Sequence, residues 1–107
     1  MPALVVHCTC PDAATAGHIA AALVDARLAA CVQQIGDVRS TYRWDGRVEQ
    51  ADEVLLLIKT ASHRLEAVVE AVRALHPYEV PELIAVEARG GLPAYLDWVI
   101  AQSRADA

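Results

Sequence analysis

Residues 42–49 read YRWDGRVE, and this stretch decides the fold. At its centre, Asp45-Gly46 supplies the positive φ angles that a two-residue type I′ turn requires. The flanking segments, residues 31–44 and 47–60, are rich in apolar and β-branched side chains, which is typical of strands. The pattern predicts a long β-hairpin in which Trp44 pairs with Arg47, with a bulge or bend at Gly36.

The second strand of this hairpin contains the apolar run VLLLI at residues 54–58. The run does not alternate between apolar and polar side chains, so we expect both of its faces to be covered. It therefore predicts a strand in the centre of the sheet.

Further strands and helices surround the hairpin in the sequence. We expect strands over residues 4–9 and 82–88, helices that begin after the caps Asp12 and Ser62, and a short terminal helix that begins at Pro93. The order is β-α-β-β-α-β followed by one helix. This order predicts an α+β, ferredoxin-like fold: one antiparallel sheet with helices on one face, a long hairpin arm and an extra C-terminal helix.

Composition limits the classes of function. The 107 residues are 55% hydrophobic and 21% charged, which predicts a single globular domain over residues 1–107. The net charge of −5 argues against a nucleic-acid partner. The sequence has no apolar run long enough for a membrane span and no secretory leader, so we expect no membrane partner. Three cysteines form no disulfide framework, which favours a cytoplasmic protein.

The predicted hairpin is longer than the helices beside it. Strands of about 13 residues extend roughly 43 Å, whereas a helix of about 14 residues extends only ~21 Å. The far half must project, with Tyr42 and Trp44 near its tip. Because an isolated ribbon is marginally stable, we expect this arm to pack on a neighbouring copy. The alternative is a solvated arm whose rings lie on the stems of Arg43 and Arg47.

Several motifs resemble the CutA divalent-cation tolerance family. They are ACV at residues 30–32, YRWDGRVE at 42–49, EVLLLIKT at 53–60, HPYEVPE at 76–82 and YLDW at 95–98. The resemblance implies a very stable homotrimer with a ferredoxin-like subunit, similar in architecture to PII-type signalling proteins. It also implies a role in tolerance of copper and other divalent ions, without an established enzymatic activity or a required cofactor. We expect Tyr42 and Trp44, together with Tyr95 and Trp98 of the terminal helix, at the interfaces.

A candidate metal site follows from the predicted topology. The first strand, which carries Cys8 and Cys10, ends at the same edge of the sheet as the second helix, which carries His76. Thiolates with an imidazole suit copper or zinc better than magnesium or calcium. The resemblance implies a copper site built from a cysteine matched by Cys8 and a His-His pair, of which His76 is present and Leu75 replaces the other. We hypothesise that Cys10 compensates.

Other interpretations stay open at this point. The two thiols can be small core residues, and His76 can cap a helix end. Cys8 with His76 can form the thiolate–imidazolium pair of a cysteine-dependent enzyme, although no glycine loop or oxyanion donor accompanies it. A PII-like regulator with a small ligand between subunits is a third interpretation, which the stiff two-residue turn disfavours. Glu79 and Glu82 can supply oxygen ligands or pair with arginines of a neighbouring subunit.

Overall fold

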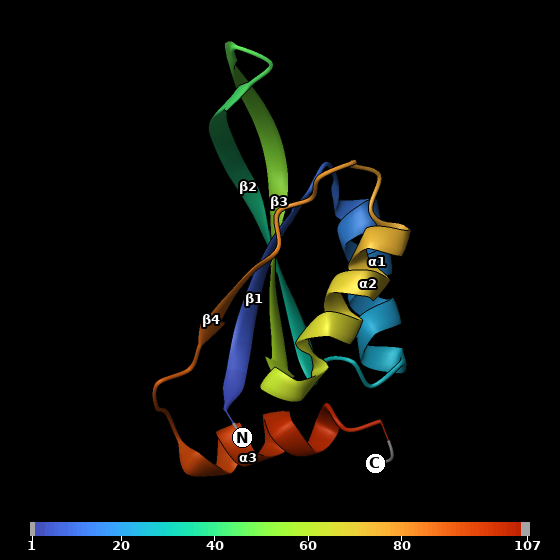
Figure 1. Ribbon diagram of the computed structural model, residues 1–107, viewed down its shortest axis with the longest axis vertical. Helices are drawn as coiled ribbons and strands as arrows, with labels where there is room; N and C mark the ends of the chain where they lie inside the picture. Colours follow the sequence, from blue (N-terminus) through green and yellow to red (C-terminus); the bar gives the residue numbers. More distant parts are fainter. Residues whose placement is uncertain (1, 106–107) are drawn as a thin grey trace.

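The long hairpin and a central sheet dominate the computed structural model, which describes residues 2–105 (Figure 1). The elements along the chain are β1 (Ala3–Cys10), α1 (Ala13–Asp25), β2 (Cys31–Trp44), β3 (Arg47–Ala61), the 3₁₀ turn η1 (Ser62–Arg64), α2 (Leu65–Leu75), β4 (Ile84–Glu87) and α3 (Pro93–Gln102).

The hairpin has the turn and the register that the sequence predicts. Asp45 and Gly46 have φ angles of 52° and 75°, and Trp44 pairs with Arg47. The β2–β3 register shifts between Ile35 and Val38, beside Gly36, which confirms the predicted bulge. Beyond this bulge, residues 38–53, here called the arm, extend past α1 and α2 (Figure 1).

The sheet is antiparallel, in the order β2-β3-β1-β4, and α1 and α2 cover one of its faces (Figure 1). Its helix-facing side chains alternate with those of the other face, and the core forms where they meet the helices. The fully buried aliphatic side chains of this core include Val6, Ile19, Leu23, Leu56, Ile58 and Val72. The predicted ferredoxin-like α+β fold is confirmed.

The ends of the elements show where local signals act. The Asp12 carboxylate accepts a hydrogen bond of 2.7 Å from the Thr15 backbone N–H, which confirms the predicted cap. Ser62 does not cap the second helix. Its backbone N–H instead donates to the Pro2 carbonyl at 3.0 Å, Ser62 begins the 3₁₀ turn η1, and α2 begins only after this turn. The fourth strand starts at Ile84 rather than residue 82 because Pro81 and its neighbours remain in the loop.

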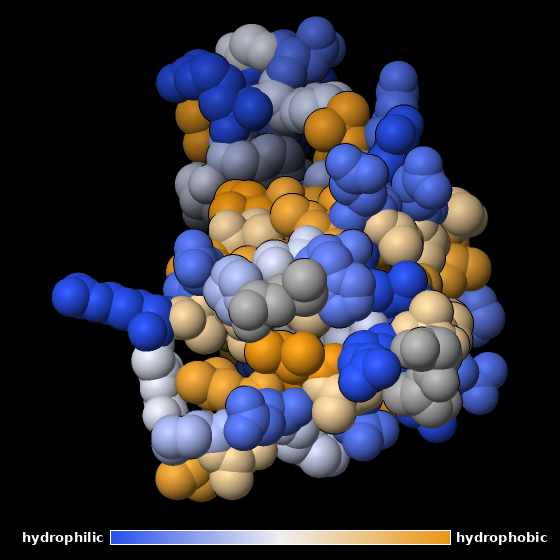
Figure 2. Space-filling view, turned by 60° about the horizontal axis from the view of Figure 1, so that its bottom comes forward, coloured by the Kyte–Doolittle hydropathy of each residue, from blue (hydrophilic) through white to orange (hydrophobic). Residues whose placement is uncertain are grey.

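The expectation that both faces of the apolar run are covered is wrong for the single chain. Leu56 and Ile58 face the helices and are fully buried, whereas Leu55 and Leu57 on the other face are only partly buried. On the same far face, Ile84 is 59% exposed. A view with the α3 end tipped forward shows apolar surface across the middle of the molecule and hydrophilic residues at the top of the arm (Figure 2). A large apolar surface thus lacks cover within one copy.

Within residues 2–105, no helix is both long and apolar enough to cross a membrane.

The contrast between buried and exposed leucines predicts unequal costs of truncation. Leu56→Ala leaves a cavity in the core and is expected to lower the free energy of unfolding by about 3 kcal/mol. The matched control Leu92→Ala removes a side chain that is 71% exposed and is expected to cost less than about 1 kcal/mol. Guanidinium unfolding at one fixed protein concentration measures both. Equal costs for the two variants would contradict the described core.

Candidate functional site

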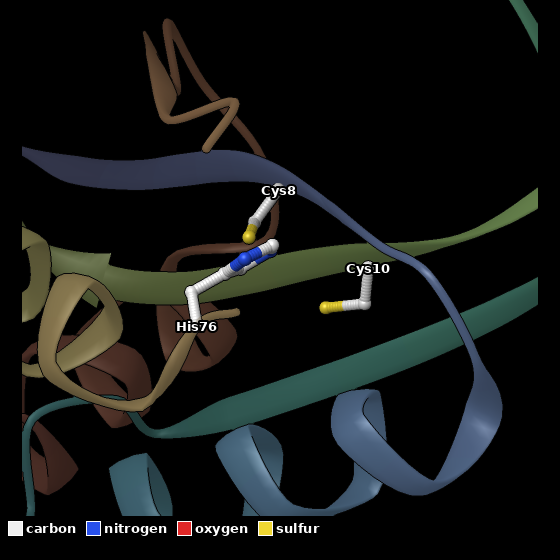
Figure 3. Close-up of side chains that lie close together, drawn as sticks. All are labelled: Cys8, Cys10 and His76. Atoms are coloured by element: carbon white, nitrogen blue, oxygen red, sulfur yellow. The ribbon is translucent and has the colours of Figure 1, made fainter. Parts of the chain in front are cut away.

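Two cysteines and a histidine meet where β1 and α2 end. Cys8 and Cys10 lie two residues apart on β1, so both side chains point to the helix-covered face, and both are fully buried. His76, the residue after α2, is also buried. The two sulfur atoms and the nearest imidazole nitrogen lie within 4.8 Å of one another (Figure 3). The convergence that the topology predicts is present.

The local sequence explains how His76 reaches this position. His76 precedes Pro77, and a residue before proline is pushed out of the helical region of φ and ψ. His76 accordingly adopts an extended backbone with φ −82° and ψ 136°, and this conformation ends α2. Its backbone N–H still donates to the Val72 carbonyl at 2.8 Å, which fixes the turn. The ring is thereby directed at β1 rather than at solvent.

Hydrogen bonds occupy both imidazole nitrogens. The Tyr78 backbone N–H donates to Nδ1 at 3.1 Å, so Nδ1 carries the lone pair. Nε2 therefore carries the proton of the neutral ring and donates to the Thr9 carbonyl at 2.8 Å. β4 pairs with β1 only as far as His7, so β4 supplies no backbone partner for the Thr9 carbonyl. His76 thus ties the α2 end to β1 instead of capping the α2 carbonyls.

The pKa values of the two thiols shift in opposite directions. Interaction with the Cys10 thiol, together with burial, raises the pKa of the Cys8 thiol well above its ordinary value. Interaction with the Cys8 thiol lowers the pKa of Cys10, against the opposing effect of burial. The Cys8 thiol itself donates a long hydrogen bond of 3.9 Å to the Thr9 carbonyl.

The donor set is soft and closely spaced. A metal ion bonded to two sulfurs at about 2.3 Å holds them no more than about 4.6 Å apart. The three ligand atoms of the cluster all lie within 4.8 Å of one another. Two thiolates and an imidazole favour Cu(I) or Zn(II) over Mg²⁺ or Ca²⁺. Three ligands are one fewer than a closed structural zinc site uses. The cluster can therefore hold a soft ion after a small adjustment, and its binding of metal stays a prediction.

A tyrosine and a buried glutamate adjoin the cluster, and the sequence analysis missed their pairing. The Tyr78 ring lies 4.7 Å from the His76 ring, and its hydroxyl donates to the Glu53 carboxylate at 2.9 Å. Burial first, and this hydrogen bond second, raise the pKa of Tyr78 to about 12. The sequence signal for a partner was the position of Glu53. Alternation along β3 places this charged residue on the same strand face as the apolar Leu55 and Leu57.

The remaining predicted site residues lie elsewhere. Tyr42 and Trp44 are exposed on the arm, and Tyr95 and Trp98 stack at 5.7 Å on α3, at the other end of the molecule (Figure 1). Cys31 opens β2, partly buried and away from the cluster. Glu79 and Glu82 are not ligands of the thiol–imidazole cluster; they line a cleft between the arm and the residue 78–82 loop.

Fold and site together define a small ferredoxin-like α+β protein with a hairpin arm and a buried thiol–imidazole cluster. Residues 4–102 match the family described as CutA1 divalent ion tolerance protein, and the chain belongs to this family. It is similar to the Divalent-cation tolerance protein CutA of Thermus thermophilus, with 47% identity over 89% of this chain and 92% of that protein. The crystal structure of CutA from Xylella fastidiosa superposes with a TM-score of 0.94 at 43% identity, covering 97% of this chain and all of that one.

A longer animal relative is also similar. The mouse Protein CutA is 50% identical over 91 residues, which make up 85% of this chain. This chain spans about half the length of that relative, 51%.

The Tyr78–Glu53 pair predicts a delayed tyrosine ionisation. Tyr78 is expected to ionise near pH 12, because its neutral phenol is favoured in the folded state. The raised pKa contributes stability below the ordinary tyrosine pKa of about 10, and this contribution is lost as the pH rises through the folded value. Glu53→Gln is expected to lower the pKa of Tyr78. Phenolate absorbance measures the titration, with Tyr78→Phe to assign the step; a Tyr78 step at the ordinary pKa of about 10 would refute the pairing.

Proposed function

We propose that this protein serves in the cellular response to divalent metal ions, copper above all, by binding them rather than by catalysing a reaction. The observation that carries the proposal is the buried cluster of Cys8, Cys10 and His76, whose ligand atoms lie within 4.8 Å of one another. The family to which the chain belongs, CutA1 divalent ion tolerance protein, supports the same role by its name. Three free cysteines agree with a reducing compartment, so we place the protein in the cytoplasm.

Binding at this cluster requires at least one hydrogen bond of His76 to open. Nδ1 becomes a ligand when it releases the Tyr78 N–H. Nε2 becomes a ligand only when its proton moves to Nδ1, which opens the bonds to both the Thr9 carbonyl and the Tyr78 N–H. Each bond is worth about 1 kcal/mol, which is small beside a metal–thiolate interaction. Cys10, on β1, supplies the third donor in this proposal, because Leu75 occupies the position of the second histidine. Metal binding therefore rearranges the start of the residue 76–82 loop.

The cluster is poorly suited to the cysteine-dependent enzyme considered above. Cys8 and Cys10 are fully buried, which denies a substrate direct approach. The His76 ring donates one hydrogen bond to a backbone carbonyl and accepts one from a backbone N–H. Both ring nitrogens are therefore occupied, and His76 does not activate a thiol. The arm is hydrogen-bonded down to its turn, which likewise opposes a mobile ligand loop of the PII type.

Metal titration of the reduced protein tests the cluster. Cu(I) and Zn(II) are expected to bind to the wild type, and Cys8→Ala and Cys10→Ala are each expected to weaken binding at least about tenfold, or 1.4 kcal/mol. Competition with a chromophoric chelator measures the affinities. Cys31→Ala is the matched control, since Cys31 lies outside the cluster. Unchanged affinity in both cluster variants would remove these thiols from the site.

The working form in this proposal is a homotrimer. Two observations support assembly: the arm extends beyond its own helices, and the far sheet face exposes Ile84 at 59% and Val86 at 51%. The aromatic side chains expected at the interfaces are exposed in the single chain at both ends of the molecule; they are Tyr42, Trp44, Tyr95 and Trp98. Burying this surface between copies stabilises each subunit by about 25 cal/mol per Å² of apolar area.

A charge on the arm is expected to disrupt this assembly. Trp44→Asp places a carboxylate where a neighbouring copy is expected to cover the indole, so the variant should sediment as smaller species and melt at a lower temperature. Ala21→Asp adds the same charge on the exposed face of α1 and serves as the control. Analytical ultracentrifugation provides the readout. If Trp44→Asp sediments and melts like the wild type, the arm is no interface.

A further inference from the structure

A tyrosine fastens the loop that carries His76 to the sheet. The Tyr78 backbone N–H donates to Nδ1 of His76 at 3.1 Å, and the two rings lie 4.7 Å apart. At its other end, the Tyr78 hydroxyl donates to the Glu53 carboxylate at 2.9 Å. One residue therefore contacts both a proposed metal ligand and a carboxylate on β3.

Glu53 is a firm anchor for this contact. It pairs with Val38 in the β2–β3 ladder, as the first pair beyond the bulge, so its backbone is fixed. Glu53 is only 8% exposed, and within residues 2–105 its carboxylate accepts one hydrogen bond, that of the Tyr78 hydroxyl. A buried carboxylate that loses its donor is unfavourable, and hydrogen bonds to charged groups are stronger than neutral ones. The bond therefore resists displacement of Tyr78.

Metal binding by His76 disturbs this contact whichever ring nitrogen is used. Nδ1 becomes a ligand only without the Tyr78 N–H, and the use of Nε2 moves the proton to Nδ1, which then no longer accepts from Tyr78. Pro77 joins the two residues with a fixed φ angle, and their rings are packed together. A turn of the His76 ring toward a metal ion is therefore expected to displace the Tyr78 phenol from Glu53.

We infer that the Tyr78–Glu53 hydrogen bond is a latch that holds the thiol–imidazole cluster in its metal-free arrangement and limits its affinity for soft metal ions. The inference rests on the proposed function, because it concerns the regulation of the same cluster. The latch stabilises only the metal-free arrangement, so it lowers the fraction of molecules that are ready to bind, and the apparent affinity falls with that fraction. Tyr78 is thus a positioning residue that acts through His76, not a ligand.

Removal of one hydroxyl group from the assembled protein tests the latch. Tyr78→Phe keeps the ring beside His76 but cannot donate to Glu53, so Zn(II) is expected to bind about fivefold more tightly, which corresponds to about 1 kcal/mol. The same variant is expected to melt at a lower temperature without metal. A merely structural role would lower the melting temperature without strengthening Zn(II) binding. Competition with a chromophoric chelator measures the affinity, and Tyr95→Phe, on α3 at the other end of the molecule, is the control.

Two neutral replacements of Glu53 separate the hydrogen bond from the charge. Glu53→Gln keeps a side-chain oxygen that accepts from Tyr78, whereas Glu53→Leu has a similar size and no acceptor. Because both variants lose the same charge, the difference between their affinities reports the latch alone. Glu53→Leu is expected to bind Zn(II) about fivefold more tightly than Glu53→Gln. Adding Tyr78→Phe to Glu53→Leu should give no further gain, because both changes remove one shared interaction.

NMR spectra of protein with isotope-labelled tyrosine Cζ show the state of the latch directly. Zn(II) is expected to shift the Tyr78 signal of the wild type toward its position in Glu53→Leu, because the phenol has lost its acceptor in both. Tyr78→Phe assigns the signal by its absence. The Tyr95 signal should not move, since Tyr95 lies away from the cluster.

Three outcomes would overturn the inference and leave the proposed function intact. They are equal or weaker Zn(II) binding by Tyr78→Phe, equal affinities of the two Glu53 variants, and a Tyr78 signal that stays in place when the wild type is loaded. Failure of the wild type to bind either Zn(II) or Cu(I) would instead overturn the proposed function and the latch together.

Discussion

The hydrogen-bonded ladder between β2 and β3 is the constraint on which the rest of the structure depends. Its turn at Asp45-Gly46 aligns the two strands, and the alignment places β3 in the centre of the sheet, beside β1. The same ladder continues beyond α1 and α2, so the arm and the far sheet face are left without cover from their own chain. The uncovered arm and the position of β1 both follow from this one pairing, because each depends on a strand that the ladder fixes.

The candidate metal cluster depends on a second, smaller constraint, the junction of His76 with Pro77. The proline ends α2 and directs the imidazole to β1, where two hydrogen bonds hold it against Cys8 and Cys10. Those bonds hold the ring in place, and the proposed function requires at least one of them to open. Tyr78 links the cluster to Glu53, because its backbone N–H donates to His76 and its hydroxyl donates to the Glu53 carboxylate.

Much of this arrangement could be predicted from the sequence, because its signals are local. Asp45-Gly46 and Asp12 act through their own backbone neighbours, and both predictions are confirmed. The meeting of Cys8, Cys10 and His76 followed from strand and helix order alone. The Tyr78–Glu53 pair could not be predicted, since it depends on how the eight-residue segment between α2 and β4 folds back across β3. The prediction that both faces of the apolar run are covered was wrong for Leu55 and Leu57 in the single chain. An apolar run does not show whether a face is covered by the protein's own helices or by another copy.

Native mass spectrometry of the wild-type protein at micromolar concentration tests the central claim most directly. If other copies of the chain cover the exposed arm and the far sheet face, the spectrum should be dominated by ions that contain three chains of 11.5 kDa each. A folded single chain as the dominant species, with the narrow low charge states of a compact protein, would contradict the account.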